Sequence, residues 1–302
     1  MNKIKNKSMK EKKSIFVIVI GTILTVYALS FVVLFLWGFT TSLKTDIQYY
    51  FNPVGLPDGM PWEWKWSNYP AVFENFYLIL VDEKGNKLKY TIEYQLMNTL
   101  LYAIVGAFIK AIVPCLVAYV AQKWDNMFSK LLYTTVIVTM IIPIIGSNAS
   151  MLVLMKGLQL YDSFIGVYIM QASYTGFYFL VYYGVFKGMA KEYSEAATID
   201  GANEYRVLFS IMFPLVKATF STVFLIMFIE LWNDYQTPLL WLPMHPTIAY
   251  GVFDMSRNTS NDLSSDPMRM ACCMIMVLPI LILFIAFRNK IMGNLTMGGV
   301  KE

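Results

Sequence analysis

A short polar cluster closes one of the long apolar stretches of the sequence, and its residue types suit contact with a hydroxyl-rich solute such as a sugar. Amide groups can satisfy hydroxyls, and the flat face of an aromatic ring packs on C–H surfaces. The candidate residues for such a substrate path are Glu230, Trp232, Asn233, Asp234 and Gln236. Polar groups in apolar spans also bond neighbouring helices to one another, so contacts inside a helix bundle, or a place near the outer interface, are equally open interpretations.

Other polar residues of the apolar stretches are further candidates for the same path. Ser147 and Asn148 follow Pro143, and Gln171 lies in a later stretch. For Lys110, which lies in an earlier stretch, we expect a polar partner or a cavity rather than a catalytic role.

The sequence lacks the residue sets of the common catalytic and metal sites. Its one histidine, His245, stands between prolines in a polar segment. The three cysteines, Cys115, Cys272 and Cys273, lie inside apolar runs, and no pair has metal-ligand spacing. Neither a phosphate loop of the G-x-x-x-x-G-K-[ST] type nor a G-x-G-x-x-G fingerprint occurs. We therefore predict no catalytic residue, no metal and no cofactor on this chain, and any nucleotide must be bound by another chain.

The elements that carry these residues are predicted to be membrane-spanning helices. The chain is 57% hydrophobic and 15% charged, whereas a soluble domain is about a quarter charged. Its charges cluster between apolar runs of about 20 residues, the length that crosses a bilayer as a helix. The fold class predicted is an all-α integral membrane protein with six transmembrane helices. Their expected ranges are 15–37, 97–121, 131–155, 164–186, 218–242 and 268–292.

The distribution of basic residues predicts the orientation of these spans. Cytoplasmic loops are enriched in lysine and arginine. With the N-terminus inside, 15 of the 24 basic residues fall on the cytoplasmic side and 8 outside, leaving Lys110 in a span. This predicts a cytoplasmic tail at 1–14, a transmembrane domain at 15–302 and two cytoplasmic termini. The first apolar run is longer than a signal-peptide core and lacks a small-x-small cleavage site, so we interpret it as a retained anchor.

Two sizeable segments are predicted to lie outside. The first, 44–92, contains an alternating apolar and polar pattern around the turn DEKGNK, which indicates a β-hairpin. The second, 243–267, is rich in Asn, Ser, Asp and Pro and is predicted to be a loop rather than a span.

The polar segment 188–217 falls on the predicted cytoplasmic side and reads as two short helices joined at Gly201. Glycine is a natural helix C-terminus, and Asn203 is a good N-cap for a second helix. After it, Tyr205, Leu208, Phe209, Met212 and Phe213 have the spacing of one apolar helix face, which Pro214 is expected to close. An apolar helix face is stabilised when it is buried against another surface. Either lipid headgroups or the groove of a partner protein can provide that surface.

The spacing within this segment resembles the signature loop of bacterial ABC-importer permeases. The pattern is E-A-A, three residues, Gly, nine residues, Ile, one residue, a hydrophobe and Pro. Phe213 stands where leucine is usual in that family. The stretches SNYPAVFEN, FIELWNDYQTPLLWL, PTIAYGVFDM and FRNKIMGNLTMGGVKE resemble the carbohydrate-uptake, maltose-type branch over nearly the whole chain. The hairpin around Gly85 is longer than that branch leads us to expect.

The resemblance implies a permease subunit of an ATP-driven, binding-protein-dependent importer of carbohydrate, with oligosaccharide expected. The implied partners are a second homologous permease subunit, two cytoplasmic ATPase subunits that use the ATP, an extracellular solute-binding protein and membrane lipid, with no nucleic acid. The implied location is the bacterial cytoplasmic (inner) membrane. The residues that would couple to the ATPase are Glu195, Ala196, Ala197, Asp200, Gly201, Ala202, Leu208, Phe209, Ile211 and Pro214.

Two other function classes make different demands on the sequence. An ion-gradient-driven secondary transporter of a small polar solute would need intramembrane ionisable groups, of which Lys110 and Glu230 are the obvious ones. Its two halves would often repeat, and no repeat of charged, broken helices is evident here. A membrane enzyme would need a histidine cluster, a nucleophile elbow or paired carboxylates in the spans, and none is present.

Overall fold

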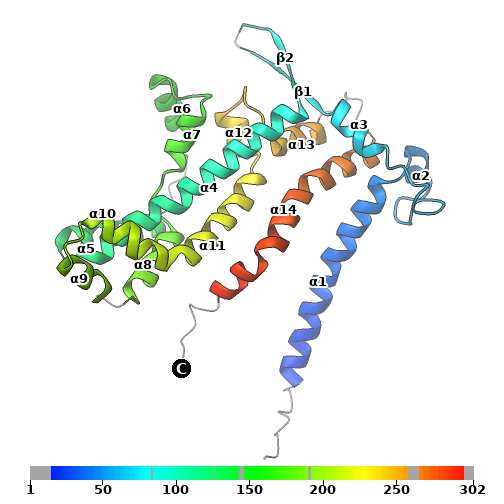
Figure 1. The fold of residues 1–302 in the computed structure, drawn as a ribbon. Coiled ribbons are helices and arrows are strands. Elements are labelled where there is room, and N and C mark those ends of the chain that lie inside the picture. Colours follow the sequence, from blue (N-terminus) through cyan, green and yellow to red (C-terminus); the bar gives the residue numbers. More distant parts are fainter. Residues whose placement is uncertain are drawn as a thin grey trace, which may run out of the picture. The chain divides into compact units, whose positions relative to one another are not determined.

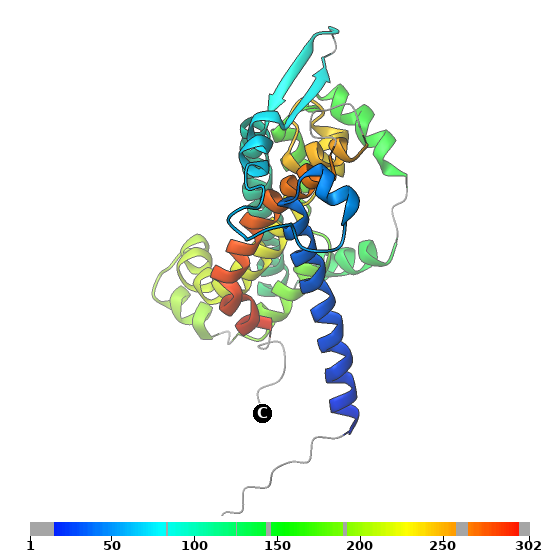
Figure 2. The same cartoon turned by 90° about the vertical axis from the view of Figure 1, so that its right-hand side faces the viewer.

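The long apolar runs of the sequence form the longest helices. The computed structural model describes residues 15–82, 84–124, 126–142, 146–189, 192–257 and 265–295, and helices dominate them (Figures 1 and 2). Within these residues, four helical segments are long and apolar enough to cross a membrane. They are α1 (Ile15–Ser42), α4 (Ile92–Lys123), the path Glu204–Trp232, and Asp266–Phe287 of α14 (Asp266–Leu295). The predicted all-α membrane class is confirmed.

The third and fourth predicted spans differ from the prediction, because each is divided into two helices. Segment 131–155 holds α5 (Met127–Ile141) and α6 (Ser147–Gly157). Ile142, which precedes Pro143, has an extended backbone, as residues before proline prefer. Segment 164–186 holds α7 (Phe164–Gln171) and α8 (Phe177–Lys187). Here Gly176 has a φ of 121°, which only glycine adopts readily, so the helix cannot continue through it.

The fifth predicted span, 218–242, is displaced toward the N-terminus. The helical path begins at Glu204, runs through α11 (Phe213–Trp232) and ends there, and α12 (Gln236–Trp241) follows as a separate short helix. The predicted loop 243–267 contains α13 (Ile248–Arg257), while residues 258–264 lie outside the described residues. The two remaining short helices before α4 are α2 (Asp46–Phe51) and α3 (Asn68–Asn75).

By its internal contacts the chain separates into two compact units, Met1–Val72 with Ser264–Met274 and Phe73–Leu263 with Ile275–Glu302. In the first unit the side chain of Lys44 is buried. Its Nζ donates to the backbone oxygens of Asn52 at 2.7 Å and Pro53 at 3.2 Å, so the charge of Lys44 is satisfied by carbonyls. Asn68 donates to the backbone oxygen of Lys44 at 3.0 Å and so fixes the same turn. Asn68 belongs to the stretch SNYPAVFEN quoted above, so this stretch helps to hold the loop together.

The second unit is built around α4, which packs most extensively on α11 and α8 (Figure 1). Small side chains make this close packing possible, because they let helix backbones approach one another. Ala103, Ala107, Ala111 and Ala118 of α4 are all fully buried. At Gly106 a Cβ atom would meet the side-chain oxygen of Gln171, so the glycine leaves room for that amide against α4.

The predicted β-hairpin is present as β1 (Tyr77–Val81) and β2 (Lys87–Thr91), an antiparallel pair with Leu80 opposite Leu88. Its turn is organised by Asp82. The carboxylate accepts from the backbone N–H of Lys84 at 2.9 Å and from that of Asn86 at 2.7 Å, and the amide of Asn86 donates to it at 2.9 Å. Gly85 completes the turn at a φ of 85°.

The turn is expected to loosen in acid. Hydrogen bonds from the side chain and backbone of Asn86 hold the pKa of Asp82 below its ordinary value. A lowered folded pKa means that the stabilisation is present above the ordinary pKa and is lost as the pH falls through the folded one. Hydrogen exchange of residues 77–91, corrected for intrinsic rates, should therefore show less protection near pH 2–3 than near pH ~6. In Asp82→Asn the protection should not change between these two pH values; equal protection of the wild-type hairpin at both would contradict the expectation.

Candidate functional site

The polar segment that links α8 to α11 forms a sharp elbow. Helix α9 (Glu192–Ile199) ends in a Schellman motif, in which the N–H of Ala202 bonds the carbonyl of Ala197 at 2.9 Å and the N–H of Gly201 bonds that of Thr198 at 3.0 Å. Gly201 has a φ of 79°, the left-handed conformation that the motif requires. Asn203 then accepts from the N–H of Arg206 at 2.9 Å and caps α10 (Glu204–Arg206). The end of α9 and the start of α10 are thus determined by Gly201 and Asn203, two residues that the sequence analysis identified.

The prediction that Pro214 closes the second short helix is wrong. Val207–Met212 forms a π-helix, η1, which joins α10 to α11 in one helical path. Proline lacks the N–H of the i→i−4 bond and its ring clashes with the carbonyl there, whereas the N-terminal turn of a helix tolerates it. Pro214 lies in the first turn of α11, directly after the π-helical segment. The wider π turn thus lets the path continue where an uninterrupted α-helix would kink.

The apolar side chains of the elbow differ in exposure and do not form one face. Ile199, Tyr205 and Phe209 are 86%, 75% and 53% exposed, whereas Met212 is buried in the core. The single face expected from α-helical spacing is therefore wrong, because the i→i+5 bonds of η1 change that spacing. Among the remaining coupling candidates, the exposed residues are Glu195, Ala196, Asp200, Gly201 and Pro214; Ala202, Leu208 and Ile211 are half-buried, and Ala197 is buried.

A cavity of about 620 Å³ lies behind the elbow, lined by the ends of α4 and α8, by α9 and, from η1, by Met212. Glu195 and Thr198 of α9 face it, opposite Tyr119 and Lys123 of α4. The first turns of α9 are therefore not packed tightly against the helices behind them. Of the described residues 193–199, only Ala197 is buried.

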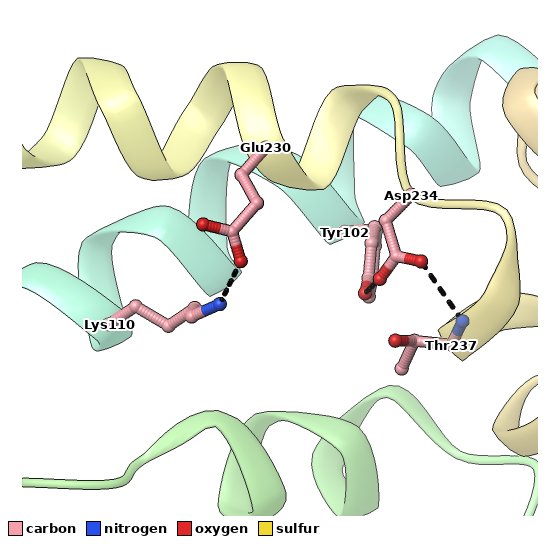
Figure 3. Close-up of polar contacts among 5 residues, drawn as sticks. All are labelled: Tyr102, Lys110, Glu230, Asp234 and Thr237. Atoms are coloured by element: carbon pink, nitrogen blue, oxygen red, sulfur yellow. Dashed lines mark hydrogen bonds and ion pairs between the residues drawn. The ribbon is translucent and has the colours of Figure 1, made fainter. Parts of the chain in front are cut away.

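A second polar feature runs between α4 and α11. Lys110 of α4 and Glu230 of α11 form an ion pair at 2.8 Å, and both side chains are partly exposed. Figure 3 shows the two side chains reaching toward each other between the helices. The expectation that Lys110 has a polar partner is confirmed. Tyr102, which sequence analysis did not single out, adds a second contact by donating to Asp234 at 2.7 Å (Figure 3).

Asp234 also organises the chain that follows α11. Its other carboxylate oxygen accepts from the N–H of Gln236 at 3.0 Å and from that of Thr237 at 3.1 Å, and so begins α12. Figure 3 shows the contact with Thr237. One carboxylate thereby fixes both the end of a spanning helix and the turn after it. At the same end of α4, Asn98 donates to the carbonyl of Pro246 at 3.0 Å, which ties the segment before α13 to the helix.

The other substrate-path candidates are placed differently. Trp232 is buried, and its indole N–H donates to the carbonyl of Met276 at 3.1 Å, so its contact joins α11 to α14 and favours the helix–helix interpretation for this residue. Asn233 and Gln236 are exposed, and the amide of Asn233 donates to the carbonyl of Ile229 at 2.8 Å. In the described part of the chain, no group of three or more His, Cys, Asp or Glu residues is arranged to hold a metal.

Comparison with known proteins identifies the family. Residues 111–292 match the family described as "Binding-protein-dependent transport system inner membrane component". The chain belongs to this family. The match includes the elbow, α11 and α4 from residue 111 onward, whereas Tyr102 and Lys110 precede it.

Relatives of this family member include named import permeases. The "Melibiose/raffinose/stachyose import permease protein MelC" of Bacillus subtilis (strain 168) is 27% identical over 68% of this chain and 75% of its own length. The "Arabinooligosaccharides transport system permease protein AraQ" of the same organism is 24% identical over 68% and 72%. The "Diacetylchitobiose uptake system permease protein NgcG" of Streptomyces coelicolor is 20% identical over 94% and 88%.

A solved structure has the same fold. It is described as "Crystal structure of a bacterial ABC transporter involved in the import of the acidic polysaccharide alginate", and its likeness has a TM-score of 0.72 at 21% identity. The likeness covers 91% of this chain and 96% of that one. The chain is accordingly a multi-pass inner-membrane component of a transport system, and it is a permease rather than an enzyme.

Proposed function

We propose that the chain is one permease subunit of an ATP-driven importer of carbohydrate, and of oligosaccharide in particular. It would form half of the translocation pathway together with a second, homologous permease subunit. Three relatives carry names that specify melibiose, raffinose and stachyose, arabinooligosaccharides, or diacetylchitobiose, which supports this class of solute. An extracellular solute-binding protein would deliver the solute, as the family description suggests.

The observation that carries the proposal is the exposed elbow at Gly201. Its apolar residues Ile199, Tyr205 and Phe209 are exposed close together in the sequence, on α9, α10 and η1, a pattern typical of a docking surface. Glu195 adds an exposed carboxylate that can bond a basic group of a partner. The partner is a cytoplasmic ATPase subunit, one for each permease, so that the elbow lies in the cytoplasm together with both chain termini.

Movement is transmitted along the helix that follows the elbow. Because the path from Glu204 to Trp232 is continuous, a push on the elbow displaces α11 as a whole. Closure of the two ATPase subunits on ATP would tilt α11 and the helices packed on it, and so expose the pathway to one side or the other. Glu230, Asn233, Asp234 and Gln236 lie at the far end of this helix, where they would contact the solute.

The experiment is uptake of labelled oligosaccharide by cells that express the complete transporter. Vanadate, which traps ATPases, is expected to abolish uptake, whereas an uncoupler that collapses the ion gradient should leave it while ATP is maintained. Within the described residues, the intramembrane pair Lys110–Glu230 favours the alternative, an ion-gradient-driven transporter of a small polar solute. That alternative requires the opposite result, with uptake lost to the uncoupler and insensitive to vanadate.

A further inference from the structure

The two halves of the elbow are held in different ways. Helix α9 has the 620 Å³ cavity behind it and, among residues 193–199, buries Ala197 alone. The second half is anchored, because Val207 and Met212 are both buried in the core of the unit. A force on the elbow is therefore passed on through the second half, while α9 has room to move.

One ion pair ties this second half to another spanning helix. Glu204, the first residue of α10, pairs with Lys123, the last residue of α4. The side chain of Lys123 is only 14% exposed, and its Nζ lies 5.4 Å from the ring centre of Tyr119 and 5.2 Å from that of Trp124. An ammonium group enclosed in this way depends on its carboxylate partner, and the aromatic rings limit the positions that it can take.

The pair is one of three polar contacts spaced along the same two helices. Tyr102–Asp234, Lys110–Glu230 and Lys123–Glu204 follow one another, and in each the donor lies on α4 and the carboxylate on or directly beside the path that contains α11. α4 and α11 also form the most extensive helix pair of the unit. The two helices are thus connected at one end, at an intermediate point and at the elbow, which suits movement as a single body.

We infer that Lys123 and Glu204 are positioning residues that pass a displacement of the elbow to α4 as well as to α11. The inference rests on the proposed function, since it requires an ATPase that acts on the elbow. Without the pair, α11 would still be pushed, but near the elbow α4 would follow through apolar packing alone, and the nearest remaining polar contact would be Lys110–Glu230. ATP hydrolysis would then continue with less solute moved for each ATP.

Charge exchange tests the inference in the complete transporter, reconstituted with its binding protein in liposomes. The quantity measured is solute transported per ATP hydrolysed, alongside the amount of chain in the membrane. Lys123→Glu and Glu204→Lys should each lower this ratio by on the order of tenfold. The double variant, which restores an ion pair with its charges reversed, should recover most of it. Lys187→Glu, at an exposed position near the end of α8, is the matched control and should leave the ratio unchanged.

A second pair of variants covers the case in which an unpaired charge prevents folding. In Lys123→Gln combined with Glu204→Gln neither charge remains, so the chain should reach the membrane in normal amounts while the ratio stays low. Lys123→Arg, which keeps the charge, should behave as wild type. The inference is overturned if the single variants or the double glutamine variant keep the wild-type ratio, or if the reversed pair is no better than the worse single variant. If instead the wild-type transporter shows no ATP-driven uptake, the proposed function itself has failed.

Discussion

Replacing Gly201 by aspartate is expected to stop solute uptake while the chain remains in the membrane. At a φ of 79° any other residue is strained, by about 1 kcal/mol, which weakens the Schellman motif but does not unfold the bundle. The added carboxylate stands beside the exposed Asp200 and alters the surface that the ATPase would contact. Uptake should fall by on the order of tenfold to a hundredfold, with ATP hydrolysis continuing, as measured on the reconstituted complex.

The hairpin supplies a matched control for this variant. Gly85 has a φ of 85°, and a Cβ atom built at either glycine meets nothing within 4 Å, so Gly85→Asp introduces the same backbone strain and the same charge at a different place. We expect it to keep uptake within about twofold of wild type, because its position lies outside the elbow. Should Gly201→Asp transport normally, or should Gly85→Asp be equally inactive, the special role of the elbow is refuted.

The second large effect is expected at Lys110 and Glu230. Removing one partner leaves an unpaired charge within a membrane-spanning helix, which costs about 2 kcal/mol or more. Lys110→Met and Glu230→Met should therefore each lower the thermal unfolding midpoint of the purified chain in detergent, by roughly 5 °C. The combined variant leaves no charge and should be more stable than either single variant, because hydrophobic replacement of a whole pair is often neutral.

Lys217→Met is the control for loss of a lysine from the same helical region. Lys217 is exposed near the first turn of α11, where its charge can reach water, so its removal should change the midpoint by less than about 2 °C. If the double variant at 110 and 230 is as unstable as the sum of the single ones, the two residues do not act as a pair. Double-mutant analysis of the same midpoints gives their interaction energy directly.

Some features of the fold and the site follow from local sequence, and these were predictable. α1, α4 and α14 follow from uninterrupted hydropathy, which depends on no other part of the chain. The elbow follows from Gly201 and Asn203, whose conformational and capping preferences act over a few residues. The hairpin follows from alternation around a turn that Asp82 and Asn86 bond together.

Other features depend on contacts between distant segments, and local patterns do not reveal them. Lys110 and Glu230 are 120 positions apart, so the sequence marks both as unusual without pairing them. The residue type of Trp232 leaves solute contact and helix–helix bonding equally open, and no local pattern pairs its indole with Met276. Pro143 and Gly176 could have indicated the breaks within 131–155 and 164–186. The high mean hydropathy of both segments nevertheless predicted continuous spans. No comparable residue marks the π-helix, because Pro214 is tolerated in the first turn of any helix that begins near it.

The π-helical segment also determines where the elbow aims. Each residue of an α-helix turns the path by about 100°, so one residue more or fewer in a turn rotates everything before it by that angle relative to the span. The outward direction of Tyr205 therefore depends on a backbone irregularity rather than on the choice of side chain alone. A one-residue insertion or deletion between Phe209 and Met212 would leave Ile199, Tyr205 and Phe209 at the same spacing from one another and yet point the whole elbow toward a different neighbour.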